Sequence, residues 1–118
     1  MKKIILATVL ALSGAGAAIA DGNVAIVDQW GWGNGQSTAQ IGHRNTAMTV
    51  QRDIGNMSST LQVGEYNFSG TAQSGFANSS VTDQMGIGNY SSTMQTDAFN
   101  SSLTVQTGVG NVSNVYQD

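Results

Sequence analysis

Glutamine and asparagine recur in this chain at a fixed spacing of 11 residues, and this period constrains the fold more than any other feature. The Gln series is Gln29, Gln40, Gln51, Gln62, Gln73, Gln84, Gln95, Gln106 and Gln117. The Asn series is Asn23, Asn34, Asn45, Asn56, Asn67, Asn78, Asn89, Asn100 and Asn111. Composition alone would scatter these residues, so a spacing kept without insertion or deletion requires a repeating geometry.

Constant and variable residues alternate between each Asn and the next Gln, which is typical of a strand with two different faces. We expect nine strands, at 23–29, 34–40, 45–51, 56–62, 67–73, 78–84, 89–95, 100–106 and 111–117. Two residues after Gln, most units carry glycine, at Gly31, Gly42, Gly64, Gly75, Gly86 and Gly108, and two units carry Asp53 or Asp97. Gly and Asp are typical of turns, so we place these residues at turns.

Short strands joined by short turns allow two arrangements. A hairpin meander would pair the units antiparallel and would not stack identical residues. A 22-residue rung of two strands and an arc instead places residue i + 22 over residue i, about 4.8 Å away, in parallel sheets. We therefore expect an all-β, amyloid-forming β-solenoid, in which a sheet of five odd-numbered strands faces a sheet of four even-numbered strands.

The constant face of each strand is the expected interior. It carries the Gln, a Thr two residues before most Gln and a small residue four before, whereas the other face mixes Phe68, Gly70 and Asp83. Closely packed columns must keep their size, and stacked identical amides can satisfy one another. The alternative is a core built from apolar residues of the variable face, namely Val24, Ile26, Met48, Val50, Leu61, Leu103 and Val105.

The N-terminus has the pattern of a secretory signal peptide over residues 1–20. Lys2 and Lys3 precede an apolar run, and Ala18 and Ala20 are the small residues of a cleavage site. The apolar run is shorter than the roughly 20 residues that a membrane anchor needs. We expect a secreted protein whose mature part is a single repeat domain, 21–118.

Composition excludes several classes of function. The chain has no Cys, one His and four Lys or Arg, of which only Arg44 and Arg52 lie beyond the signal peptide. Disulfides, thiolate chemistry and Cys-based zinc sites are therefore excluded, and a basic face for nucleic acid is absent. No Ser or Asp forms an evident triad with His43. We expect no enzymatic activity, no cofactor and no nucleic-acid partner.

The repeat resembles the curlin repeat of bacterial curli fibre subunits. The resemblance rests on Gln-x-Gly-x-x-Asn-x-small-x-x-x-Gln, seen for example in Gln62–Gln73 and Gln84–Gln95, and it covers essentially all of 21–118. It implies a structural subunit of extracellular functional amyloid, used in adhesion and biofilm matrix. The implied partners are further copies of the chain, a nucleator subunit, a periplasmic chaperone and an outer-membrane secretion pore.

Two departures from the family bear on the role of the chain. The family's major subunit carries a Gly-rich leader that engages the secretion pore, whereas the repeats here begin at Asn23, directly after the expected cleavage site. The nucleator often ends in a basic, irregular repeat, whereas the last unit here, 111–117, is regular. The resemblance therefore favours the major subunit over the surface-anchored nucleator.

Both ends of the expected solenoid leave their amide columns unfinished. Asn23 and Gln29 begin the columns, Asn111 and Gln117 end them, and we expect no room for capping segments. Uncapped strands can add another copy head to tail, which gives a filament. The alternative is a soluble ice-binding solenoid with a flat Thr ladder, formed by Thr38, Thr49, Thr60, Thr71, Thr82, Thr93 and Thr104.

Three acidic residues are candidate gatekeepers against premature aggregation. Asp53 and Asp97 replace turn glycines, and Asp83 lies on the variable face of a strand. Charges at such places slow the association of exposed strands. The alternative for Asp53 and Asp97 is that Asp simply suits a turn.

Overall fold

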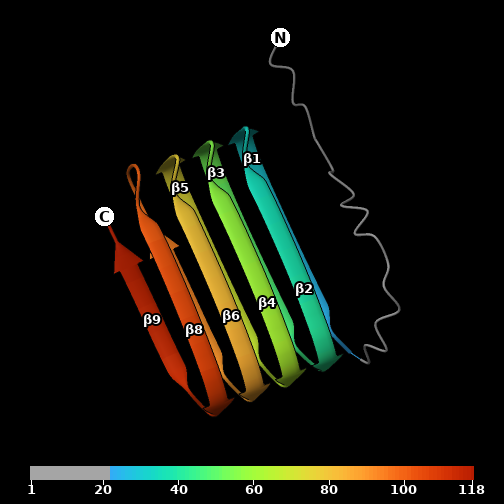
Figure 1. The fold of residues 1–118 in the computed structure, drawn as a ribbon. Helices are drawn as coiled ribbons and strands as arrows, with labels where there is room; N and C mark the ends of the chain where they lie inside the picture. Colours follow the sequence, from blue (N-terminus) through green and yellow to red (C-terminus); the bar gives the residue numbers. More distant parts are fainter. Residues whose placement is uncertain (1–21) are drawn as a thin grey trace.

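The computed structural model describes residues 22–118, so the predicted signal peptide with Ala18 and Ala20 lies outside the described residues. Residues 22–118 form nine strands (Figure 1). They are β1 (Val24–Trp32), β2 (Gly35–His43), β3 (Thr46–Ile54), β4 (Met57–Glu65), β5 (Phe68–Phe76), β6 (Ser79–Ile87), β7 (Tyr90–Gln95), β8 (Ser101–Val109) and β9 (Val112–Gln117). Within this part of the chain, no helix has the length and apolarity needed to cross a membrane.

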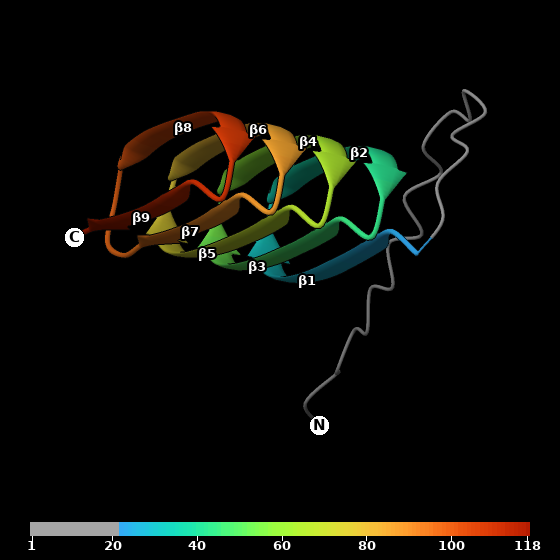
Figure 2. The same ribbon diagram turned by 90° about the horizontal axis from the view of Figure 1, so that it is seen from below.

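The strands form two facing parallel sheets, which Figure 2 shows as two layers. One sheet has the order β1-β3-β5-β7-β9 and the other β2-β4-β6-β8. Each residue pairs with the residue 22 positions later, as in Gln29 with Gln51 and Gln40 with Gln62. The predicted β-solenoid, with its five-stranded and four-stranded sheets and its in-register stacking, is therefore confirmed.

The strand bounds differ from those predicted. Every strand begins one residue after its Asn, and all except β7 and β9 continue three residues beyond their Gln. The prediction that Gly31, Gly42, Gly64, Gly75, Gly86 and Gly108 lie at turns is therefore wrong, since these glycines lie inside the strands. Their positive φ angles, from 109° to 124°, bend each strand before its corner without ending the ladder.

The interior is polar. Among the described residues, Ala47 is the one buried hydrophobic side chain, and the other buried side chains are Asn, Gln, Ser and Thr. The apolar residues of the variable face point outward, and Ile26 and Leu103 are 49% and 70% exposed. The constant face is thus the interior, as predicted. The alternative of an apolar core is wrong, because hydrogen-bonded amides stabilise the polar interior.

Candidate functional site

Two glutamine columns run the length of the described solenoid. One contains Gln29, Gln51, Gln73, Gln95 and Gln117, and the other Gln40, Gln62, Gln84 and Gln106. Each Nε2 donates to the Oε1 of the next Gln, at 2.7–2.8 Å for the pairs from Gln51 to Gln117 and from Gln40 to Gln106. Most Nε2 groups also donate to the backbone carbonyl 16 residues earlier. Both columns are therefore polar, with every hydrogen bond from one Gln to the next donated toward the C-terminal end.

The asparagines lie at the corners and bond mainly to the backbone. The Oδ1 of each Asn from Asn23 to Asn89 accepts the backbone N–H of the Asn one rung later, as in Asn67 to Asn89 at 3.0 Å. Asn45, Asn67 and Asn89 also donate from Nδ2 to the carbonyls four residues before and 19 residues after. Direct Asn–Asn side-chain bonds form only from Asn67, Asn89 and Asn111. The expected amide ladder thus holds for Gln, whereas Asn fastens each corner to the next.

Serine and threonine fill the rest of the interior without such bonds. The hydroxyls of Thr49, Thr71 and Thr93, among others, are buried and have no hydrogen-bond partner. Val27 and Val115 occupy the same column as these threonines. The Thr side chains from Thr49 to Thr104 point inward, so they offer no flat Thr face to solvent.

The glycines inside the strands are required because the backbones of successive rungs approach each other closely at these positions. A Cβ on Gly31, Gly42, Gly64, Gly75 or Gly86 would lie 1.8–2.1 Å from the carbonyl oxygen of the residue one rung later. Gly108, at the C-terminal end of its column, would instead meet only the Asn111 side chain, at 3.4 Å. Every such Cβ would point toward the next rung, so the space beyond Gly108 is where another rung would lie.

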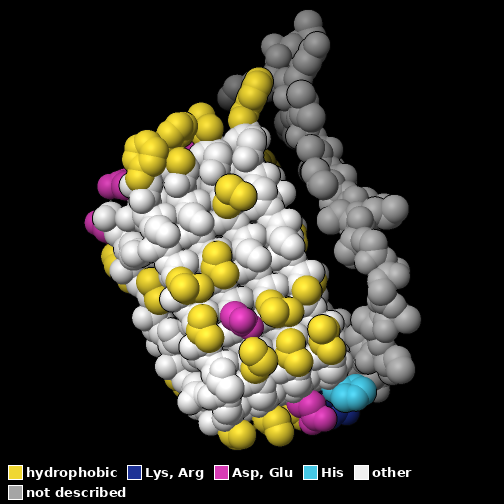
Figure 3. Space-filling view, viewed as in Figure 1, with side chains coloured by type: hydrophobic (Ala, Val, Ile, Leu, Met, Phe, Trp, Pro, Cys, Tyr) yellow, Lys and Arg dark blue, Asp and Glu magenta, His cyan; other side chains and the backbone are white. Residues whose placement is uncertain are grey.

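The acidic residues occupy two kinds of place. Asp53 and Asp97 share a column with Gly31 and Gly75 and alternate with them, so no two carboxylates are adjacent. The Oδ2 of Asp53 accepts the backbone N–H of Gly75 at 3.1 Å. Asp83 lies outward on β6, in register with Leu61 and Val105. Figure 3 shows an acidic side chain surrounded by hydrophobic ones on this face.

Two pairs of stacked side chains on the outer surface were not predicted from the sequence. The rings of Phe68 and Tyr90 stack at 5.0 Å, and the Arg44 guanidinium lies 5.4 Å from the centre of the Tyr66 ring. Both pairs are 22 residues apart, so the period that revealed the amide columns could also have revealed them.

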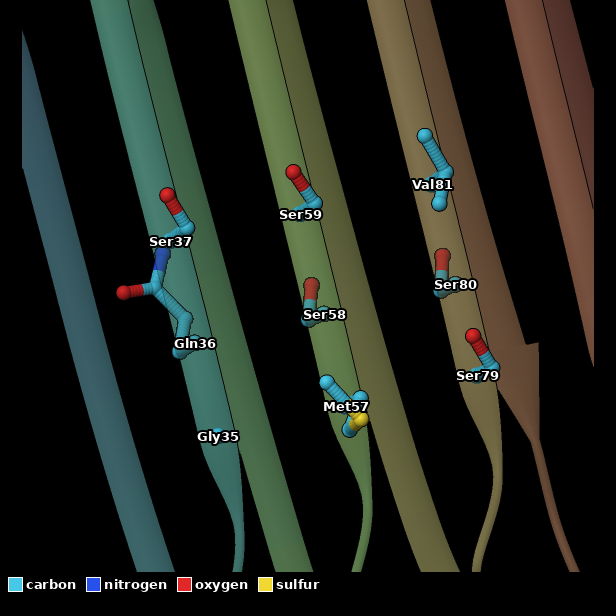
Figure 4. Close-up of a pocket in the computed structure, with 9 residues that line it drawn as sticks. All are labelled: Gly35, Gln36, Ser37, Met57, Ser58, Ser59, Ser79, Ser80 and Val81. Atoms are coloured by element: carbon cyan, nitrogen blue, oxygen red, sulfur yellow. The ribbon is translucent and has the colours of Figure 1, made fainter.

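Residues 22–118 contain no group of three or more His, Cys, Asp or Glu residues that could hold a metal ion. A depression over the starts of β2, β4 and β6 is lined by five serines together with Gly35, Gln36, Met57 and Val81 (Figure 4). Another is lined by Trp30, Gly31, Arg52 and Asp53. His43 lies at the end of β2 beside Glu65, away from both linings.

The two ends of the described solenoid are chemically complementary. At the N-terminal end, Gln29 and Gln40 donate to Gln51 and Gln62, but no residue of 22–118 donates to the Oε1 of Gln29 or Gln40. At the C-terminal end, Gln106 and Gln117 accept from Gln84 and Gln95, and each has one N–H directed past the last rung. Acceptors are thus open at one end and donors at the other.

Comparison with known proteins found no family model and no curated protein that matches this chain. The resemblance of its repeat to the curlin repeat therefore stays a prediction.

Proposed function

We propose that this chain is a structural subunit that assembles head to tail into an extracellular fibre. The observation that carries the proposal is the polarity of the glutamine columns, with acceptors open at Gln29 and Gln40 and donors open at Gln106 and Gln117. A head-to-tail contact joins different surfaces and does not close, so it produces a filament.

The sheet edges support the same assembly. In residues 22–118, β1 and β2 begin the sheets and β8 and β9 end them, and the backbone on the outer side of each can pair with another strand. The chain has no Pro to interrupt a strand, and 9% of its residues are charged. These features are typical of segments that form cross-β fibres.

The biological setting follows from the resemblance to curli subunits. In this proposal the chain is secreted and forms the major part of a functional amyloid that serves adhesion and biofilm matrix. Its partners are other copies of itself, a nucleator subunit, a chaperone and a secretion pore. The gatekeeper role of Asp53, Asp83 and Asp97 belongs to the same proposal, since an exported subunit must not polymerise early.

A refolding experiment tests the proposal. The chain is purified in denaturant, diluted into buffer and followed by thioflavin fluorescence, and the product is examined by fibre diffraction. We expect a lag followed by growth, and a reflection near 4.8 Å along the fibre axis. A soluble monomer that persists would contradict the proposal, and thermal hysteresis of its freezing solution would favour the ice-binding alternative.

A further inference from the structure

The C-terminal end of the described solenoid is a step. Residues 22–118 contain an odd number of strands. The five-stranded sheet, which ends with β9, therefore extends half a rung further than the four-stranded sheet, which ends with β8. Successive strands alternate between the sheets, each half a rung further along. The position next in line is therefore in the four-stranded sheet, directly on β8.

A second copy can approach this step in two ways, if the proposed head-to-tail fibre is correct. When its β1 lies on β9, its β2 lies two strand spacings, about 9.6 Å, from β8. The four-stranded sheet then lacks one strand at the junction. The backbone of β8 and the open N–H of Gln106 would lie in this gap without the partners that buried polar groups require.

The other approach leaves no gap. When β1 of the next copy lies on β8, its β2 lies on β9, and every spacing is that of an ordinary rung. Gln106 donates to Gln29 of the next copy, and Gln117 donates to Gln40 of the next copy. The backbone N–H groups of Asn23 and Asn34 of the next copy meet the Oδ1 atoms of Asn100 and Asn111, repeating the bonds seen within the chain.

We propose that consecutive copies exchange sheets, so that each copy is turned by about half a turn about the fibre axis. The nine strands of the described part span 4.5 rungs (9/2), or about 22 Å of fibre. The outer face of the four-stranded sheet, with its apolar side chains and Asp83, then appears on alternate sides of the fibre from one copy to the next.

Cysteine pairs on the outer faces distinguish the two approaches. In the exchanged junction Ile26 of one copy lies beside Leu103 of the other, because Gln29 lies beside Gln106. In the unexchanged junction Ile26 lies beside Asn114, because Gln29 lies beside Gln117. All three side chains point outward and are exposed, so their replacement leaves the interior columns intact.

The experiment compares Ile26→Cys/Leu103→Cys with Ile26→Cys/Asn114→Cys. Each variant is polymerised in reductant, oxidised as fibres, dissolved in denaturant and resolved on non-reducing gels. We expect disulfide-linked multimers from the first variant, with at least about tenfold fewer from the second, since disulfides need Cα atoms within about 7 Å. The reverse pattern, or equal linkage, would overturn sheet exchange and leave the fibre proposal standing. The absence of fibres would overturn both.

Gly108 gives a second readout that needs no cross-link. In the exchanged junction a Cβ on Gly108 would meet the carbonyl of Gly31 of the next copy, as the glycine column does within the chain. In the unexchanged junction it would face the gap. We expect Gly108→Ala to slow seeded growth at least about tenfold. The control Gly110→Ala, also at positive φ but with no atom within 4 Å of its Cβ, should change growth far less. Equal growth of the two variants would contradict the exchange.

Discussion

The middle and the ends of this solenoid are built from the same repeat, yet only the middle rungs have their interior side chains fully buried. Gln51, Gln73 and Gln95 are at most 1% exposed, whereas Gln29 and Gln117 of the same column are half-buried. Val27, in the first rung, is 45% exposed, whereas Thr71 in the same column is 3% exposed. This difference shows that a rung is buried by the rungs on either side of it. In the proposed fibre, another copy supplies the neighbour that each end rung lacks.

The largest expected effect is a difference in the free energy of unfolding between substitutions at two glycines of one column. Gly86→Ala places a Cβ 1.9 Å from the Gly108 carbonyl, and the Cβ of Gly108→Ala meets nothing closer than 3.4 Å within the chain. We expect Gly86→Ala to lower the free energy of unfolding of the soluble chain by about 3 kcal/mol or more. Gly108→Ala should cost clearly less, because it adds only the strain of its positive φ. Urea unfolding directly after dilution measures both.

Gly35→Ala is the control for this pair, since Gly35 lies in a strand with open space around its Cβ and an ordinary φ. Its stability should match that of the parent chain. Equal losses for Gly86→Ala and Gly35→Ala would show that the close approach between rungs is not what selects glycine.

A second prediction compares two glutamines of one column. Gln73→Leu leaves one N–H of Gln51 without its acceptor and the Oε1 of Gln95 without its donor in the interior, and we expect a loss of about 2–3 kcal/mol in the soluble chain. Gln117→Leu removes the acceptor of Gln95 and the donor to the Ser101 carbonyl, both at a partly exposed end, and should cost about half as much.

In the proposed fibre, Gln73→Leu and Gln117→Leu should lower the stability by similar amounts, because Gln117 gains a second neighbour there. The denaturant concentration that dissolves the fibres measures this. A difference between Gln73→Leu and Gln117→Leu that persists in the fibre would mean that the glutamine column does not continue across the junction.

A smaller effect is expected for the charges. Asp53→Gly/Asp97→Gly removes two carboxylates from the glycine column, and we expect the lag before fibre growth to shorten a few-fold. The control is Asp28→Asn, which removes an exposed charge from β1 outside that column. An unchanged lag in the double variant would contradict the gatekeeper role of Asp53 and Asp97. Asp53 would then keep only its role of accepting the Gly75 N–H.

The smallest effect is expected for the hydroxyl columns. Thr71→Val removes a buried hydroxyl that has no partner and creates the side chain already present at Val27 and Val115. We expect a change in the free energy of unfolding between zero and a gain of about 1 kcal/mol. A loss above about 1 kcal/mol would show that the threonine hydroxyls are bonded in solution and share the role of the amides.

The period of 11 residues predicted the strand number, the register, the pairing of the sheets and the polar interior, because stacking identical residues leaves few other geometries. It misplaced the strand ends, because glycine at positive φ is typical of turns and Gly64 instead bends a continuing strand. It also treated Asn like Gln. The shorter Asn side chain at a corner reaches backbone groups first, as Asn45 does with the Gly64 carbonyl at 2.9 Å.

The polarity of the amide columns could not be predicted from the sequence. An amide can point either way along a column, and its direction is set by the second bond that most of these Gln make, for example from Gln51 to the Gly35 carbonyl at 3.0 Å. The period gives the partners of a column, but only the three-dimensional arrangement of neighbouring backbone carbonyls distinguishes its donor end from its acceptor end.

Mixed-label solid-state NMR tests the continuity of the columns most directly. Fibres are grown from equal parts of ¹⁵N-labelled and ¹³C-labelled chain, so a nitrogen–carbon contact can arise only between copies. We predict cross-peaks between the side-chain Nε2 of one Gln and the Cδ of another, lost when Gln29 and Gln40 of the carbon-labelled chain are both replaced by Leu. Well-ordered fibres of the parent chain without these cross-peaks would contradict the account.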